Sequence, residues 1–177
     1  QNERLRRLLN DVSLITRMED GSALIGKEQV VINDIISEVR AELDVMPREE
    51  RLNLHVDFKD KVTIEGNLSL IASIFSNLTE NAIAYSEGQN IYISLLENTE
   101  QACRIRFEDD GKGVAQNHLP HLFDRFYRID AGRSRKVGGT GLGLPIVKNT
   151  IRTFGGKISV SNRHQGGLEF RFTLPKA

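Results

Sequence analysis

The feature that most constrains the fold is a hydrophobic spacing that switches repeatedly, along 177 residues, between the helical period of 3.6 and the strand period of two. Helical spacing recurs over about 33–45, 67–85 and 144–154, and alternation recurs over about 52–58, 91–95, 103–107, 158–160 and 168–174. Elements of both kinds bury their apolar faces by packing helices on a sheet. We therefore predict an α/β sandwich with helices on one side of a mixed sheet.

Composition excludes several classes of protein. The 24 basic and 24 acidic residues cancel, so no global field favours nucleic acid or an anionic membrane. The single Cys103 excludes an internal disulfide and a multi-cysteine zinc site. No apolar run approaches the roughly 20 residues that a membrane helix needs, so we expect the chain itself to be soluble. A start at Gln1 rather than Met favours an excerpt of a longer protein, in which membrane segments could lie upstream.

The first residues form an appendage to the main domain. Apolar residues recur there at helical spacing between charged ones, namely Leu5, Leu8, Leu9, Val12 and Ile15. Such a narrow apolar stripe needs a partner helix. Asp20, Gly21 and Ser22 then interrupt the pattern. We place the boundary so that residues 1–26 are the appendage and residues 27–177 the main domain.

Two asparagines lie inside the predicted helix 67–85. Asn77 and Asn81 are four residues apart, so they lie one turn above each other beside the apolar face. Asparagine is a poor helix former, and a local preference that is violated twice tends to mark function. A neutral amide oxygen is a suitable ligand for Mg²⁺. Taken alone, the pair is more typical of two exposed helix residues.

An acidic turn with two glycines follows the strand at 103–107. In Asp109-Asp110-Gly111-Lys112-Gly113, the glycines permit positive φ angles and close approach of a ligand. Asp109 can accept a hydrogen bond from an amino group such as that of adenine. The alternative is a plain acidic turn, because Asp-Gly is common in turns.

The most specific single element is the glycine-rich loop at residues 138–143, which opens a helix with Pro145 in its first turn. Such a loop offers free N–H groups and a positive dipole end to phosphate, and the alternative is a flexible hinge. Between the acidic turn and this loop, periodicity is poor and arginines gather, which indicates a functional or mobile segment. Of these arginines we select Arg128 as a phosphate ligand, because guanidinium groups bind phosphate bidentately.

Together these segments resemble the catalytic domain of sensor histidine kinases, within the gyrase/Hsp90/histidine kinase/MutL ATPase superfamily. The matching segments are an asparagine box, a first glycine box, a phenylalanine box, a second glycine box and a closing hairpin, at 77–86, 109–113, 122–128, 139–144 and 166–175. Residues 1–21 resemble the end of the second helix of the dimerisation domain. The resemblance implies a Bergerat-type fold, in which a mostly antiparallel sheet of about five strands carries three helices on one face.

The resemblance also implies roles for the matched residues. Asn81, with Asn77 nearby, would hold Mg²⁺ and phosphates, Asp109 would bind the adenine amino group, and Tyr85 would lie beside the nucleotide. Arg128 would contact phosphate, which makes Asn81 and Arg128 the expected catalytic residues. A lid would span about 114–140. The remaining expected nucleotide contacts are Gly111, Gly113, Gly139, Thr140, Gly141, Leu142, Gly143 and Leu144.

The implied function is binding of ATP with Mg²⁺ and transfer of its γ-phosphoryl group to a histidine in a dimerisation domain, for relay to the receiver domain of a response regulator. No histidine of this chain has the context of a phospho-acceptor, so we expect that residue outside it. We further expect a homodimeric, membrane-anchored full-length protein with this domain in the cytoplasm, a fragment that can be monomeric, and no nucleic-acid partner. Two residues depart from the usual pattern of the family. They are Ala84, where many members have lysine, and Pro145, where a small residue is usual. The alternatives are a nucleotide-binding scaffold without kinase activity and an ATP-driven clamp.

Overall fold

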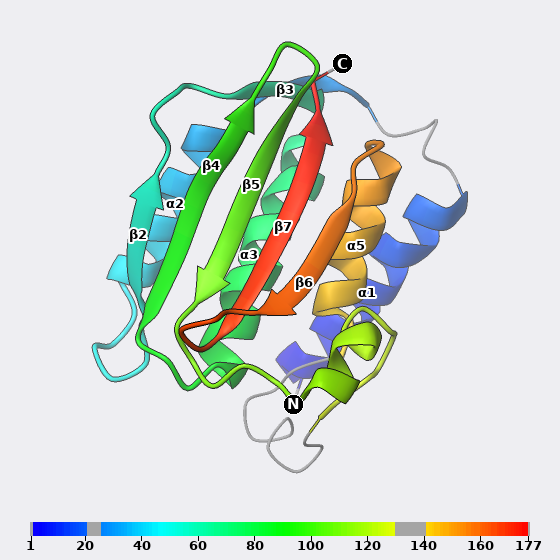
Figure 1. The fold of residues 1–177 in the computed structure, drawn as a ribbon. Helices are drawn as coiled ribbons and strands as arrows, with labels where there is room; N and C mark the ends of the chain where they lie inside the picture. Colours follow the sequence, from blue (N-terminus) through cyan, green and yellow to red (C-terminus); the bar gives the residue numbers. More distant parts are fainter. Residues whose placement is uncertain (1, 21–25, 130–140, 177) are drawn as a thin grey trace.

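The computed structural model of the chain describes residues 2–20, 26–129 and 141–176. Its centre is a five-stranded sheet in the order β2-β4-β5-β7-β6 (Figure 1). β2 and β4 pair in parallel, and the other three pairs are antiparallel, which confirms the predicted mixed sheet. In the order of the sheet the strands are β2 (Asn53–Asp57), β4 (Asn90–Asn98), β5 (Ala102–Asp109), β7 (Leu168–Pro175) and β6 (Ile158–Asn162).

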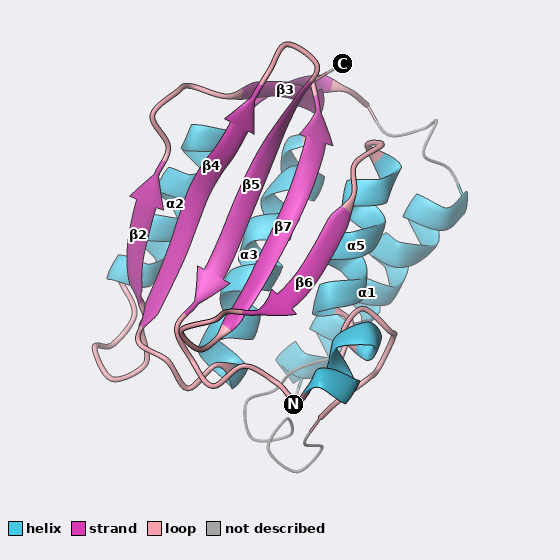
Figure 2. Ribbon diagram, in the orientation of Figure 1, coloured by secondary structure: helices cyan, strands magenta, loops and turns pink. Residues whose placement is uncertain are grey.

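Three helices cover one face of this sheet and leave the other face open (Figure 2). They are α2 (Ile32–Asp44), α3 (Leu68–Tyr85) and α5 (Gly143–Thr153). Alternate residues of the strands point toward the helices, so that Phe107, Phe170 and Phe172 are almost completely buried. Phe75 of α3 meets Phe172 edge-on, with ring centroids 5.8 Å apart. The observed layers confirm the predicted two-layer α/β sandwich.

A second, two-stranded sheet lies at one end of the sandwich. It pairs β1 (Glu28–Val31) with β3 (Thr63–Gly66) in antiparallel fashion, with Val30 opposite Ile64. The Asn33 side chain joins the two segments, because its Oδ1 accepts the N–H of Val62 at 2.8 Å. No periodicity in the sequence predicted that these two short strands would pair apart from the main sheet.

The first helix, α1 (Asn2–Asp20), lies outside the sandwich, alongside α5. Its Ile15 and Met18 are buried in a small apolar cluster together with Leu142 and Ile146. Residues of the same stripe nearer the N-terminus stay exposed, namely Leu5, Leu9 and Val12. The predicted stripe therefore has two parts, one packed on the main domain and one uncovered.

The segment between β5 and α5 begins with the short 3₁₀ helix η2 (Gln116–His121). Phe126 follows with a φ of 62° and donates its N–H to the carbonyl oxygen of Gly141 at 2.9 Å. Residues 130–140 of the predicted lid lie outside the described part of the chain. Over the described residues, no helix combines the length and the apolar character that crossing a membrane requires.

Candidate functional site

A cleft of about 1020 Å³ lies over the carboxyl end of β5, between α3, the start of α5 and the segment that follows β5. Most of the residues selected from the sequence line it together, although they come from three distant parts of the chain. Those that line the cleft are Asn77, Asn81, Tyr85, Asp109, Gly113, Arg128, Gly141, Gly143 and Leu144.

Asp109 is the most buried carboxylate of the cleft, with 3% of its surface exposed. Its Oδ1 accepts the backbone N–H groups of Gly111 at 3.0 Å and Leu168 at 3.2 Å. Burial raises the pKa of Asp109, and the two backbone hydrogen bonds oppose that rise. The side chain is therefore a fixed, largely desolvated acceptor at the end of β5.

The two asparagines of α3 present amide oxygens rather than charges. The Nδ2 of Asn77 donates to the carbonyl oxygen of Ser73 at 2.8 Å. Its Oδ1 faces the start of α5, where a methyl group placed on Gly143 would lie 3.2 Å from it. Among the described residues, the Asn81 side chain has no hydrogen-bond partner. The cleft thus holds two neutral oxygen acceptors of the kind that Mg²⁺ takes as ligands.

The N-terminus of α5 supplies hydrogen-bond donors rather than acceptors. Leu142, at the N-cap position, makes no side-chain capping hydrogen bond, so the N–H groups of the first turn are not capped by that side chain. Gly143 and Leu144 line the cleft there, and Pro145 has no N–H to offer. N–H groups that the N-cap side chain does not cap and the positive end of the helix dipole together favour an anion.

Of the four remaining predicted contact residues, two lie outside the described part of the chain and two do not line the cleft. Gly139 and Thr140 lie outside the described residues. Gly111 packs against the end of α3, where an added methyl group would overlap the carbonyl oxygen of Ser86. Leu142 is only 1% exposed, because its side chain fills the cluster beneath α1. Its position in the glycine loop predicted contact with a ligand, but the start of α5 turns this side chain away from the cleft.

Several cleft residues were not selected from the sequence. Glu80 lines the cleft beside Asn81, although its charge fits a solvated helix face. Lys112, between the two glycines of the acidic turn, also lines it and forms an ion pair with Glu87 at 3.1 Å. His118 lines it too, and its Nδ1 contacts the hydroxyl of Tyr127. Proximity to Asn81 and Asp109 in the sequence was the one signal that could have identified the first two.

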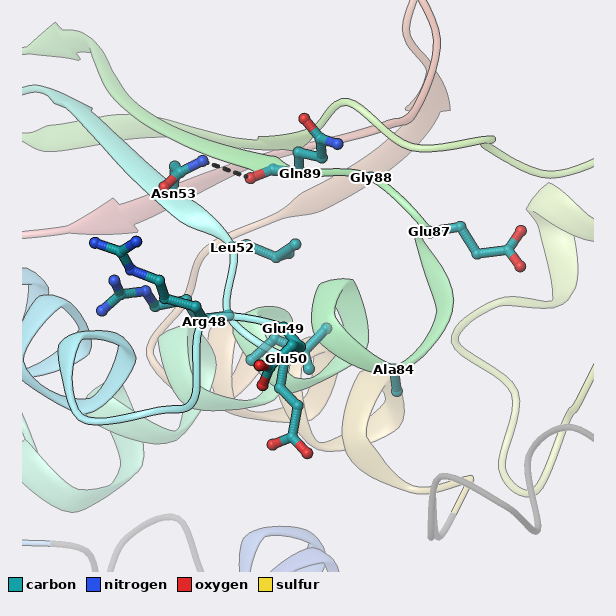
Figure 3. Close-up of a pocket in the computed structure, with 11 residues that line it drawn as sticks. Arg48, Glu49, Glu50, Leu52, Asn53, Ala84, Glu87, Gly88 and Gln89 are labelled. Carbon is teal, nitrogen blue, oxygen red and sulfur yellow. Dashed lines mark hydrogen bonds between the residues drawn. The ribbon is translucent and has the colours of Figure 1, made fainter.

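A second hollow of about 820 Å³ adjoins the cleft at the end of α3 (Figure 3). Ala84 borders both, together with Glu49 and Glu50. Arg48 extends away from Ala84 in Figure 3, and Arg51 donates to the carbonyl oxygen of Asp44 at 3.1 Å. Acidic and basic side chains therefore both line the hollow that Ala84 borders.

The sequence matches a known family model over residues 66–177, described as Histidine kinase-, DNA gyrase B-, and HSP90-like ATPase. It is 32% identical to the phosphate regulon sensor protein PhoR of Haemophilus influenzae over 99% of the chain, and 32% identical to the sensor protein SrrB of Staphylococcus aureus over 99%. It spans only 41% and 30% of the length of these two relatives.

The fold is also similar to that of a solved protein. The full-length histidine kinase ShkA, in complex with AMPPNP, superposes with a TM-score of 0.82 and 24% identity over 98% of this chain and 36% of ShkA. Fold, cleft and sequence match agree. The chain belongs to the histidine kinase-, DNA gyrase B- and HSP90-like ATPase family, as a sensor histidine kinase ATP-binding domain.

Proposed function

We propose that this domain binds ATP with Mg²⁺ in the cleft and transfers the γ-phosphoryl group to a histidine outside the chain. The observation that carries the proposal is the convergence, in one cleft, of a buried carboxylate, two amide oxygens and an uncapped helix N-terminus. These groups match the adenine, the cation and the phosphates of the nucleotide respectively. Membership in the family supports ATP binding and a kinase role in two-component signalling.

Adenine recognition is assigned to Asp109. Its Oδ1 is already held by the backbone N–H groups of Gly111 and Leu168. A carboxylate fixed in this way can accept a hydrogen bond from the exocyclic amino group of adenine. Because the carboxylate is buried, a base without that amino group would leave it unpaired, which is costly in free energy. The site would therefore prefer adenine over purines that lack the amino group.

The phosphates would lie between the start of α5 and Arg128. Asn77 and Asn81 fit as ligands of the magnesium ion, which neutralises phosphate charge during phosphoryl transfer. The N–H groups of Gly143 and Leu144 and the guanidinium of Arg128 would hold phosphate oxygens. Catalysis in such a site depends on positioning and charge neutralisation, so it requires no nucleophile from this domain.

In the transfer itself, the bond between the γ-phosphorus and the bridging oxygen breaks and a phosphorus–nitrogen bond to an imidazole forms, with loss of the imidazole proton. We place that imidazole in a dimerisation domain, of which α1 would be the last helix. The exposed Leu5, Leu9 and Val12 of α1 support this assignment, since they form an uncovered apolar stripe. Residues 1–26 would then belong to the dimerisation hairpin and 27–177 to the catalytic domain. Relay to a response regulator and anchoring of a full-length homodimer follow from the family and stay predictions.

A nucleotide-binding scaffold without kinase activity is a second candidate. It is favoured by Ala84, because the resemblance to sensor histidine kinases places a lysine at this position in many family members. A scaffold would bind the nucleotide with the same groups but transfer no phosphoryl group.

The first experiment measures ATP binding by calorimetry with and without Mg²⁺. The wild type should bind ATP in a magnesium-dependent way, and Asn81→Ala should lose most of that dependence. Asn98→Ala is the matched control, because Asn98 ends β4 in an exposed position and does not line the cleft. A wild type that binds no nucleotide at any Mg²⁺ concentration would contradict the proposal.

The second experiment separates the kinase from the scaffold. The chain is incubated with γ-labelled ATP and a dimerisation domain that carries the phospho-acceptor histidine. Acid-labile label on that partner is the expected result. If ATP binds normally but no label appears, the scaffold is the correct reading.

A further inference from the structure

Arg163, in the turn between β6 and β7, makes contacts that the proposed nucleotide site does not itself require. Its Nη1 donates to the carbonyl oxygen of Asp109 at 3.0 Å and to that of Gly166 at 3.3 Å. Its Nε lies 3.2 Å from Oε1 of Glu108 in an ion pair, and only 12% of its side chain is exposed. Nε has no aligned hydrogen-bond partner in the described residues, so the pair with Glu108 is electrostatic rather than a directed bond.

The Arg163 guanidinium is held in place across the open face of the sheet. It lies over the ring of Tyr92 on β4, 5.2 Å from the centroid. Tyr92 also stacks with the ring of His55 on β2, at a centroid distance of 4.9 Å. The Nε2 of His55 in turn contacts Oδ1 of Asn90 at 2.8 Å. The Arg163 side chain is therefore contacted by residues of β4 and β5, and His55 of β2 packs on the tyrosine beneath it.

The β6–β7 turn surrounds Asp109 on two sides. The turn contributes the Nη1 donor to the Asp109 carbonyl oxygen, and Leu168 at its end contributes the N–H that binds Oδ1. Gly167 lies so close that an added methyl group would overlap the same carbonyl oxygen. Backbone and carboxylate of Asp109 are thus attached to the same turn, and Arg163 is the side chain that makes the backbone attachment.

We propose that Arg163 is a positioning residue that fixes Asp109 for recognition of the exocyclic amino group of adenine. The proposal rests on the proposed function, in which Asp109 reads that group. Arg163 itself touches no nucleotide. It acts by holding the end of β5 against the β6–β7 turn, so that the carboxylate keeps its direction when the base enters the cleft.

The experiment compares the affinity for ATP with that for purine riboside triphosphate, which lacks only the amino group. A hydrogen bond to a charged group contributes about 1.5 to 3 kcal/mol, so the wild type should prefer ATP by roughly 10-fold or more. In Arg163→Gln the preference should fall below about threefold. Binding of ATP weakens there, whereas binding of the analogue, which has no amino group for Asp109 to accept, stays the same. Arg163→Lys, which keeps the charge but not the planar fork, should give an intermediate preference. Arg104→Gln is the control, since Arg104 is exposed on the same face of β5 and forms only a loose pair with Glu97.

Each outcome decides between roles. A folded Arg163→Gln that keeps the wild-type preference overturns the proposal, and so does an equal weakening of both nucleotides, which marks a purely structural role. If Arg163→Gln does not fold, a folded Arg163→Lys with the full wild-type preference overturns it. If the wild type itself shows no preference for ATP, the proposed recognition of adenine by Asp109 is wrong. The proposed role of Arg163 is then wrong as well.

Discussion

Replacing Gly167 with alanine tests whether the close contact between the β6–β7 turn and Asp109 holds the site together. Gly167 has a φ of 99°, and a methyl group there would overlap the carbonyl oxygen of Asp109 and lie 2.7 Å from its carboxylate. Gly155 has a similar φ of 85°, but a methyl group there would meet only Pro175 at 3.6 Å. Gly155→Ala therefore has the same kind of backbone strain without the collision.

The expected magnitudes differ accordingly. An alanine held in such a conformation costs about 1 to 3 kcal/mol in both variants. In Gly167→Ala the turn must also move away from Asp109, which breaks the hydrogen bonds from Arg163 and Leu168. One of these goes to a neutral and one to a charged acceptor, so their loss adds about 2 to 4 kcal/mol. Gly167→Ala should thus destabilise the domain by about 3 to 7 kcal/mol, a large part of the usual stability of a domain.

Urea unfolding followed by circular dichroism gives the free energy of unfolding of both variants and the wild type. A Gly167→Ala that is unfolded without urea fits the expectation if Gly155→Ala still folds. If the two variants differ by less than about 1 kcal/mol, the contact does not hold the turn, and the reasoning from it is refuted.

Three further predictions follow from single side chains. The Asn162 side chain binds the backbone of Val114 through two hydrogen bonds of 2.9 and 2.7 Å. Asn162→Ala should therefore lower the free energy of unfolding by about 1 to 3 kcal/mol and speed hydrogen exchange at the Val114 amide. Unchanged exchange would contradict this. Burial raises the pKa of the Cys103 thiol to about 11, so a thiol reagent at pH 8 should label it only at the rate of unfolding, whereas labelling as fast as a free thiol would disprove the burial. Burial also raises the pKa of Asp109, and the ionised carboxylate accepts the amino proton more strongly than the neutral acid, so the preference for ATP over the purine analogue should weaken as the pH falls through this raised value; a preference that stays constant down to the ordinary aspartate pKa would argue against it.

The local pattern of the chain was enough to predict the elements. The helical spacing of Phe75 and Leu78 placed α3 within a residue of its observed bounds, and the alternation ending at Phe107 placed β5. Both follow from short-range geometry, since period and burial are properties of neighbouring residues. The pairing of β1 with β3 depends on contacts between distant segments, and no period in the sequence predicted it.

The same division applies to the candidate site. Residue chemistry was enough to select Asn77, Asn81 and Asp109. Amides inside a helix violate local preference, and an acid at the end of a strand can accept a hydrogen bond from an amino group. The sequence does not tell where a side chain points. For this reason Leu142 was predicted to contact the nucleotide, although its side chain packs under α1.

The elements and the chemical groups of the site are therefore encoded in neighbouring residues of the chain. How those groups are held depends on contacts that form only when the chain folds. Arg163 lies 54 positions from Asp109, outside every segment selected from the sequence, and it reaches that residue only because β5 and β7 pair in the sheet. Sheet pairing joins residues far apart in the chain, so the support of the site appears only when the fold is formed.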